Sequence, residues 1–143
     1  MKHTIIYFIG VYDTLDLFTG KLREAFETMG YASFVYDARL PQSKDALLSV
    51  LAESSSPERE FSCVTFNNLG YNLEVPAPAQ SVRENDACIQ KGGTRNVWEY
   101  YGIPYLNILM DHPFHYEKPL RLAPETSVVL CTDRNHVKYI RRY

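Results

Sequence analysis

The chain has 143 residues, a formal net charge of −2, 45% hydrophobic residues and 22% charged residues. This length fits one domain with its own core, and the composition is typical of a globular protein that needs no disulfide or metal to fold. The near-neutral charge argues against a nucleic-acid partner, and no apolar run approaches the roughly 20 residues of a membrane span.

The three cysteines, Cys63, Cys88 and Cys131, are odd in number and lack paired spacing. This argues against a disulfide framework and for a reducing compartment. The apolar core of the first residues is too short for a signal peptide. We therefore expect a cytoplasmic protein.

The first half of the chain alternates between short apolar runs and segments with helical periodicity. The apolar runs predict strands, and the apolar residues spaced three and four apart predict helices. Gly30 suits the end of the first helix, and Pro41 suits the first turn of the second. The expected elements are strand 5–10, helix 13–30, strand 32–38, helix 41–55 and strand 61–68.

The second half is less regular at its start. Two prolines and few apolar residues predict a loop over 70–82, with a short helix somewhere in 82–91. Thr94 is the expected cap, and Gly102 the expected stop, of the next helix. The remaining expected elements are helix 94–102, strand 104–111, an irregular stretch broken by Pro119, strand 126–133 and helix 134–143.

This order of elements predicts an α/β fold. Strand and helix alternate about five times, and continuously apolar strands are typical of a sheet covered on both faces. We expect a Rossmann-like, doubly wound, mostly parallel sheet of about five strands in three α/β/α layers. A flavodoxin-like or receiver-like single domain is the alternative. Because the last predicted helix has no stop signal, we expect residues 1–143 to be the N-terminal domain of a longer two-domain protein.

Polar residues follow every predicted strand. In open parallel sheets, ligands bind outside the carboxyl ends of the strands. Asp or Asn at these positions also caps helices or forms turns, and this remains the alternative for Asp13, Asp37 and Asp133. The candidate binding residues are Gly10, Tyr12, Asp13, Asn67, Asn68, Arg134 and His136.

The sequence Asp111-His112-Pro113 is the most specific of these strand ends. Pro113 favours an extended conformation for His112, which would hold it at the strand tip. His115 would share its face if a helical turn begins at Pro113. Asp111, His112 and His115 are therefore the candidate catalytic residues, since a histidine there would serve as a general base.

Sequence fingerprints for metals and cofactors are missing. The chain has no HExxH or CxxC spacing, so we expect no metal site. Gly92-Gly93-Thr94 would receive an anion at a helix start, or would simply be a flexible turn. It lacks the dinucleotide and P-loop patterns, so we expect no cofactor.

Two segments, NVWEYYGIPYLNILMDHPFHY and VVLCTDRNHVKYIRRY, resemble the amino-terminal half of bacterial GT-B-type glycosyltransferase-like proteins, including a group related to spore-maturation proteins. The resemblance covers about the last third of the chain. It implies a two-domain enzyme without a bound metal, in which this domain faces a small-molecule or glycan acceptor and a C-terminal domain binds the nucleotide-sugar.

The resemblance also implies roles for individual residues. Gly10 would lie near the donor phosphates, Asp111 or His112 would deprotonate an acceptor hydroxyl, and Arg134 and His136 would border the cleft. The alternative is a non-catalytic domain of the same fold that binds a small ligand or has a regulatory role.

Overall fold

A computed structural model describes residues 2–52, 59–76, 80–84, 87–91 and 93–142. Its centre is a five-stranded sheet in the order β2-β1-β3-β8-β9, in which every neighbouring pair is parallel. The expected doubly wound parallel sheet is thus confirmed. The strands are β1 (Lys2–Ile9), β2 (Ala32–Asp37), β3 (Arg59–Phe66), β8 (Tyr105–Leu109) and β9 (Ser127–Cys131).

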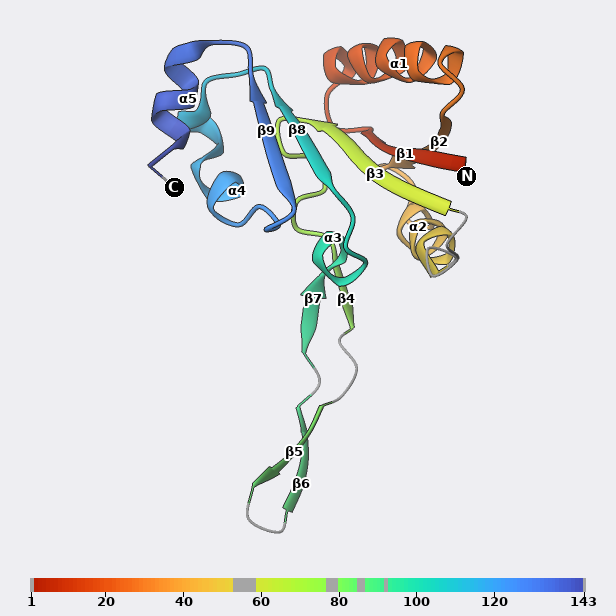
Figure 1. Ribbon diagram of the computed structural model, residues 1–143, viewed down its shortest axis with the longest axis vertical. Coiled ribbons are helices and arrows are strands. Elements are labelled where there is room, and N and C mark those ends of the chain that lie inside the picture. The colour runs from red at the N-terminus through yellow and green to blue at the C-terminus, as the bar shows by residue number, and fades with distance from the viewer. Residues whose placement is uncertain (1, 53–58, 77–79, 85–86, 92, 143) are drawn as a thin grey trace.

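Helices cover both faces of this sheet, as Figure 1 shows. Helix α1 (Asp13–Thr28) packs over a small core, and α2 (Ser43–Ala52) and α3 (Val97–Tyr100) pack over a larger core on the opposite face. The buried core residues are Ile5, Tyr7 and Val64 on the α1 side, and they include Ile6, Phe8, Leu47, Leu51, Trp98 and Tyr105 on the other side.

Helix α1 ends as the sequence predicts. Gly30 has a φ of 92°, a left-handed conformation that glycine adopts without a Cβ clash. Its N–H donates to the Glu27 carbonyl, and the Tyr31 N–H donates to the Phe26 carbonyl. These bonds satisfy carbonyls of the last helical turn and turn the chain into β2.

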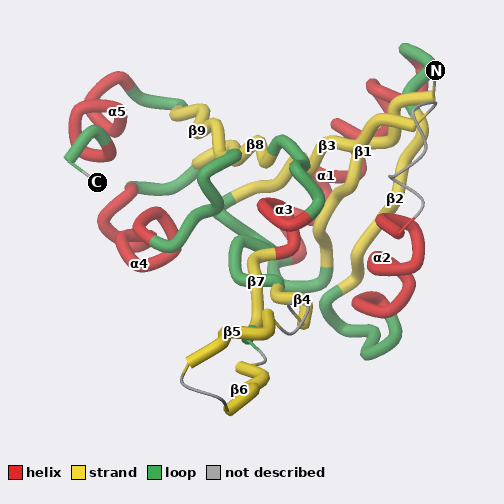
Figure 2. Tube along the Cα trace, turned by 60° about the horizontal axis from the view of Figure 1, so that its bottom comes forward, coloured by secondary structure: helices red, strands yellow, loops and turns green. Residues whose placement is uncertain are grey.

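The segment between β3 and α3 corrects two expectations. Strands β4 (Glu74–Pro76) and β7 (Thr94–Asn96) pair antiparallel, and so do β5 (Gln80–Glu84) and β6 (Ala87–Lys91). The expected loop 70–82 therefore contains strand pairing, and the helix expected within 82–91 is wrong. The reason is that the backbone groups of β4 pair with the later segment β7, and those of β5 pair with the adjacent β6, and helical periodicity reveals neither pairing. Figure 2 shows these hairpins extending away from the main sheet.

Pairing with β4 also moves the start of the next helix. Thr94 was the expected cap, but it lies in β7, and Asn96 caps α3 by accepting from the Trp98 N–H at 3.0 Å. Gly102, with a φ of 64°, follows the end of α3 as expected. Residues 53–55 of the second expected helix, residues 77–79 of the expected loop, Gly92 and Tyr143 lie outside the described residues.

Beyond β8 the chain forms a short 3-10 helix, η2 (Pro113–Tyr116), then α4 (Glu117–Arg121) and, after β9, α5 (Arg134–Ile140). Pro119 does not break α4, because it stands in the first turn, where a backbone N–H has no helical partner. None of the helices in the described ranges is long and apolar enough to span a bilayer.

Candidate functional site

The order in which the chain adds strands to the sheet reverses between β1 and β3. The chain winds from β1 outward to β2 on one side and from β3 through β8 to β9 on the other. Ligands of open α/β sheets bind in the crevice outside the carboxyl ends of strands at such a switch point. A cavity of about 450 Å³ lies here, lined by Tyr12, Thr14, Leu15, Phe18, Asn67, Met110, Asp111 and Tyr116. We call it the switch-point crevice.

Asn67 organises one wall of the switch-point crevice. It follows β3 in a left-handed conformation, with a φ of 49°, and is only 4% exposed. Its Oδ1 accepts from the Met110 N–H at 2.9 Å, and its Nδ2 donates to Oδ2 of Asp111 at 2.8 Å. The asparagine thereby ties the end of β3 to the end of β8 and fixes the Asp111 carboxylate.

Tyr116 is the second donor to this carboxylate. Its hydroxyl donates to Oδ2 of Asp111 at 3.0 Å. Burial, together with the Asp111 hydrogen bond and charge, raises the pKa of Tyr116 to about 12, so the phenol keeps its proton at neutral pH. Both donors reach Oδ2. Within the described part of the chain no hydrogen bond to Oδ1 is seen, so this oxygen is left to accept from a ligand.

Asn68 lies behind the switch-point crevice rather than in its lining. It is also left-handed, with a φ of 60°, but it is 1% exposed and does not line the switch-point crevice. Its backbone N–H donates to Oδ1 of the buried Asn107 at 2.8 Å. Among the described residues, its side-chain amide has no hydrogen-bond partner. Asn68 therefore supports the loop after β3 from behind rather than facing the crevice.

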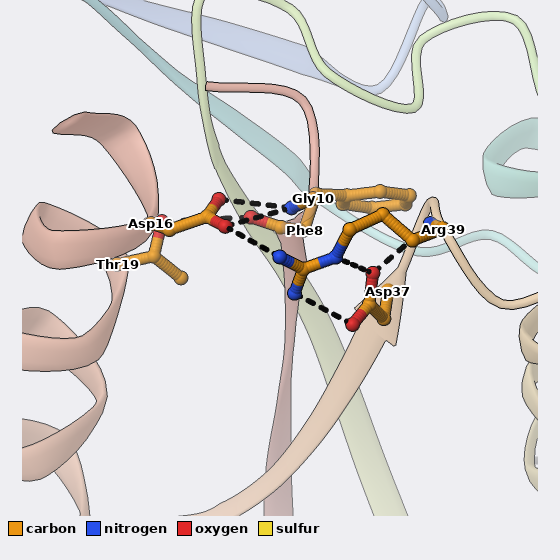
Figure 3. A network of polar contacts seen from close by, with 6 residues as sticks. All are labelled: Phe8, Gly10, Asp16, Thr19, Asp37 and Arg39. Atoms are coloured by element: carbon orange, nitrogen blue, oxygen red, sulfur yellow. Dashed lines mark hydrogen bonds and ion pairs between the residues drawn. The ribbon is translucent and has the colours of Figure 1, made fainter. Parts of the chain in front are cut away.

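The first loop is held by charged side chains, shown in Figure 3. The Gly10 N–H donates to both carboxylate oxygens of Asp16, at 2.9 and 3.0 Å. Arg39 binds the Asp37 carboxylate at 2.8 Å and lies 3.8 Å from Asp16. Hydrogen bonds from Arg39 hold the pKa of the Asp37 carboxyl below its usual range. A Cβ on Gly10, whose φ is 91°, would collide with Asp37.

This arrangement bears on the role that the resemblance implies for Gly10. A phosphate-binding loop offers free backbone N–H groups to its ligand. Here the Gly10 N–H already binds a carboxylate, and a second carboxylate, that of Asp37, lies beside it. Because two carboxylates and only one arginine surround this loop, a phosphate would be repelled there. Asp13, which follows, is an exposed first residue of α1.

The three predicted catalytic residues lie in different surroundings. Asp111 lines the switch-point crevice, whereas His112 and His115 do not. Nδ1 of His112 accepts from the Phe114 N–H at 3.2 Å and so caps η2, with the extended backbone that Pro113 predicts. The exposed ring of His115 packs edge-on against Phe114, with centroids 5.8 Å apart.

The ring of His112 instead faces α5. It lies edge-on to the rings of His136 and Tyr139, with centroids 4.8 and 5.6 Å away. Asp133 caps α5 by accepting from the Asn135 N–H at 2.7 Å. It therefore has the capping role that was the alternative to ligand binding. Arg134 is exposed in the first turn of α5. The β9 end of the rim is therefore separate from the switch-point crevice.

Several crevice residues were not predicted from the sequence, among them Thr14, Leu15, Phe18, Met110 and Tyr116. Leu15 and Phe18 looked like members of an apolar helix face, but the first turns of α1 border the crevice. Tyr116 lies five residues after Asp111, and only the 3-10 turn between them brings its hydroxyl back. A search for aromatic residues near the strand ends would have found it.

No cluster of three or more His, Cys, Asp or Glu side chains that would hold a metal ion occurs in the described ranges. No protein-family model, curated protein or solved structure matches the chain.

Proposed function

We propose that this chain is the acceptor-side domain of a sugar transferase and that it binds a hydroxyl-rich acceptor in the switch-point crevice. The observation that carries the proposal is the Asp111 carboxylate, held by Asn67 and Tyr116 at the sheet's switch point. The same proposal assigns the protein to the cytoplasm and the nucleotide-sugar to a second, C-terminal domain.

The lining of the crevice favours a neutral ligand with both hydroxyl groups and apolar faces. A carboxylate, an amide and phenols suit hydroxyl groups, while Leu15, Phe18 and Met110 suit carbon–hydrogen faces. None of the eight described lining residues is Lys or Arg. A phosphorylated ligand would therefore find no positive charge there, whereas a neutral glycan or polyol needs none.

In this proposal Asp111 is the base. An acceptor hydroxyl donates to Oδ1, and the proton moves to the carboxylate as the hydroxyl oxygen bonds to the sugar carbon and the bond from that carbon to the nucleotide breaks. Asn67 and Tyr116 are positioning residues, because they hold Oδ2 and so aim Oδ1. His112 is a weaker candidate than the sequence indicated, because its Nδ1 already caps η2.

The binding step is tested with the purified chain by saturation-transfer NMR and calorimetry against neutral mono- and oligosaccharides, their phosphorylated forms and nucleotide-sugars. Asp111→Asn should weaken binding of a neutral saccharide by roughly 10-fold or more, the usual size of a charged hydrogen bond. Asp45→Asn, on the exposed start of α2, is the matched control and should bind normally. Binding of nucleotide-sugars but not neutral saccharides would contradict the acceptor-side assignment.

The alternative, a non-catalytic binding domain, is favoured by the use of His112 as a helix cap. Transfer by the complete gene product, with donor and the bound saccharide, separates the two functions. Loss of transfer in Asp111→Asn supports the enzyme. Saccharide binding without transfer supports the binding domain.

A further inference from the structure

A second polar cluster lies near the amino ends of β1 and β3, at the end of the sheet opposite to the switch-point crevice. In the β1–β3 register His3 pairs with Glu60, and Ile5 pairs with Ser62. Because side chains alternate along a strand, Glu60 and Ser62 project from the same face. Nε2 of His3 lies 2.9 Å from Oγ of Ser62, and its Nδ1 lies 3.3 Å from Oε2 of Glu60.

This geometry is that of an activated nucleophile. A neutral His3 that carries its proton on Nδ1 donates to Glu60 and accepts the Ser62 hydroxyl proton at Nε2. A hydroxyl, an imidazole base and a carboxylate that orients the base define the serine nucleophile arrangement wherever it occurs, independent of fold. Both distances lie in the range found in catalytic sites without bound substrate, where such hydrogen bonds are often long.

The imidazole is held in place by aromatic packing. The His3 ring lies edge-on to Tyr31, with centroids 5.5 Å apart and planes at 80°. Tyr31 in turn packs edge-on against Phe26 of α1, at 5.4 Å. The His3 side chain is about one-third exposed, so its ring is both positioned and reachable from solvent.

Two cavities meet at His3 and Ser62. A crevice of about 420 Å³ with a mixed polar and apolar lining also contains Arg59 and Glu60. A largely apolar groove of about 340 Å³ runs between α1 and strands β8 and β9. The side chains that give the groove its apolar lining are Ile5, Phe26, Val64, Leu106 and Val128. An apolar pocket on one side of a hydroxyl and a partly polar opening on the other fits an ester with an apolar acyl group.

We propose that Ser62 and His3 are catalytic residues of an ester-hydrolysing site, with Glu60 as the positioning residue. The Ser62 oxygen bonds to the ester carbonyl carbon as its proton moves to Nε2 of His3. The carbon–oxygen bond to the alcohol then breaks, and His3 returns the proton to the departing alkoxide. A water molecule hydrolyses the acyl-serine by the same path, restoring Ser62.

The proposal also assigns a place to the acyl group. The acyl chain would lie in the apolar groove against Phe26 and Val128. This activity does not depend on the switch-point crevice, so either site can be present without the other.

The test uses the purified chain with p-nitrophenyl butyrate as substrate and a fluorophosphonate as a serine-directed label. We expect hydrolysis above the buffer rate and mass-spectrometric labelling of the peptide that carries Ser62. Ser62→Ala and His3→Gln should each lower kcat/KM by roughly 100-fold or more, the usual range for such groups. Ser49→Ala on α2, whose hydroxyl bonds the Asp45 carbonyl, is the control and should leave the rate unchanged.

Two further variants separate a catalytic role from a structural one. Glu60→Gln should lower kcat while leaving KM unchanged, as expected for a residue that orients the base. Ser62→Cys keeps a nucleophile and should transfer the labelling from the fluorophosphonate to iodoacetamide at the same position. Hydrolysis at the buffer rate, or a fluorophosphonate label on any residue other than Ser62, would overturn the proposal.

Discussion

Gly70 lies beneath the Phe8 ring, and replacing it with alanine should show how tightly the larger core is packed. A Cβ at Gly70 would lie 2.7 Å from Cε2 of Phe8, and closer still to two other ring carbons. The ring has little room to retreat, because Phe8 is 4% exposed and packs on Tyr36 and Trp98, with centroids 4.8 and 5.8 Å away. The Gly70 carbonyl also accepts from the Trp98 indole N–H at 2.8 Å, which holds the backbone in place.

Gly30 provides the matched control. Both glycines are left-handed, with φ of 79° at Gly70 and 92° at Gly30, but a Cβ at Gly30 would meet nothing within 4 Å. Each alanine substitution carries a left-handed backbone cost of about 1–2 kcal/mol, offset by about 0.4–1 kcal/mol from the stiffer unfolded chain. Only Gly70→Ala adds the overpacking of Phe8, which costs about 1–3 kcal/mol.

The free energy of unfolding is measured in urea, followed by the fluorescence of Trp98, the single tryptophan. Gly70→Ala should be less stable than Gly30→Ala by about 1–3 kcal/mol. Phe8→Leu should recover part of that difference in the Gly70→Ala background, since the two side chains share one space. Equal losses in the two alanine variants would refute the packing argument.

Three other predictions follow from local contacts. Arg39 lowers the folded-state pKa of Asp37. The pair therefore stabilises the fold above the usual carboxyl pKa of 3.8 and loses that contribution as the pH falls through the lower folded value. Arg39→Gln should make the free energy of unfolding fall less steeply with decreasing pH, and parallel curves for the two proteins would contradict this. Asn96→Ala should cost about 1 kcal/mol in urea unfolding, because the Trp98 N–H loses its cap; a loss within error would mean that water replaces the cap. Burial raises the pKa of the Cys63 thiol well above its usual value, so Cys63 should resist thiol reagents until the protein unfolds. Mass spectrometry follows the labelling, and rapid labelling of Cys63 in the folded protein would refute this prediction.

The candidate site was predicted in part. Asn67, Asp111 and Tyr12 were placed at strand ends by the order of elements, and the structure brings them to one crevice. The sequence predicted that His112 and Asp111 share one catalytic site, but the side chains of adjacent residues at a strand end point in different directions. Asp111 faces Asn67 and Tyr116, whereas the His112 ring packs against α5.

The second cluster shows a limit of sequence reading. His3, Glu60 and Ser62 are separated by 57 residues or more between β1 and β3, and neither strand carries a motif that marks them. Only the parallel register between the two strands sets His3 beside Ser62. A long-range register is decided by the packing of both sheet faces, which no local pattern records.

The sequence by itself determined the α/β class, the five parallel strands and the end of α1 at Gly30, because apolar periodicity and glycine conformation act over a few residues. The tertiary structure decided which residues far apart in the chain meet. The β4–β7 pairing placed the cap of α3 at Asn96. Pairing of the neighbouring segments β5 and β6 replaced an expected helix. The strand order placed the switch point between β1 and β3 and so chose which polar loops face one another, since that order depends on how helices cover the whole sheet.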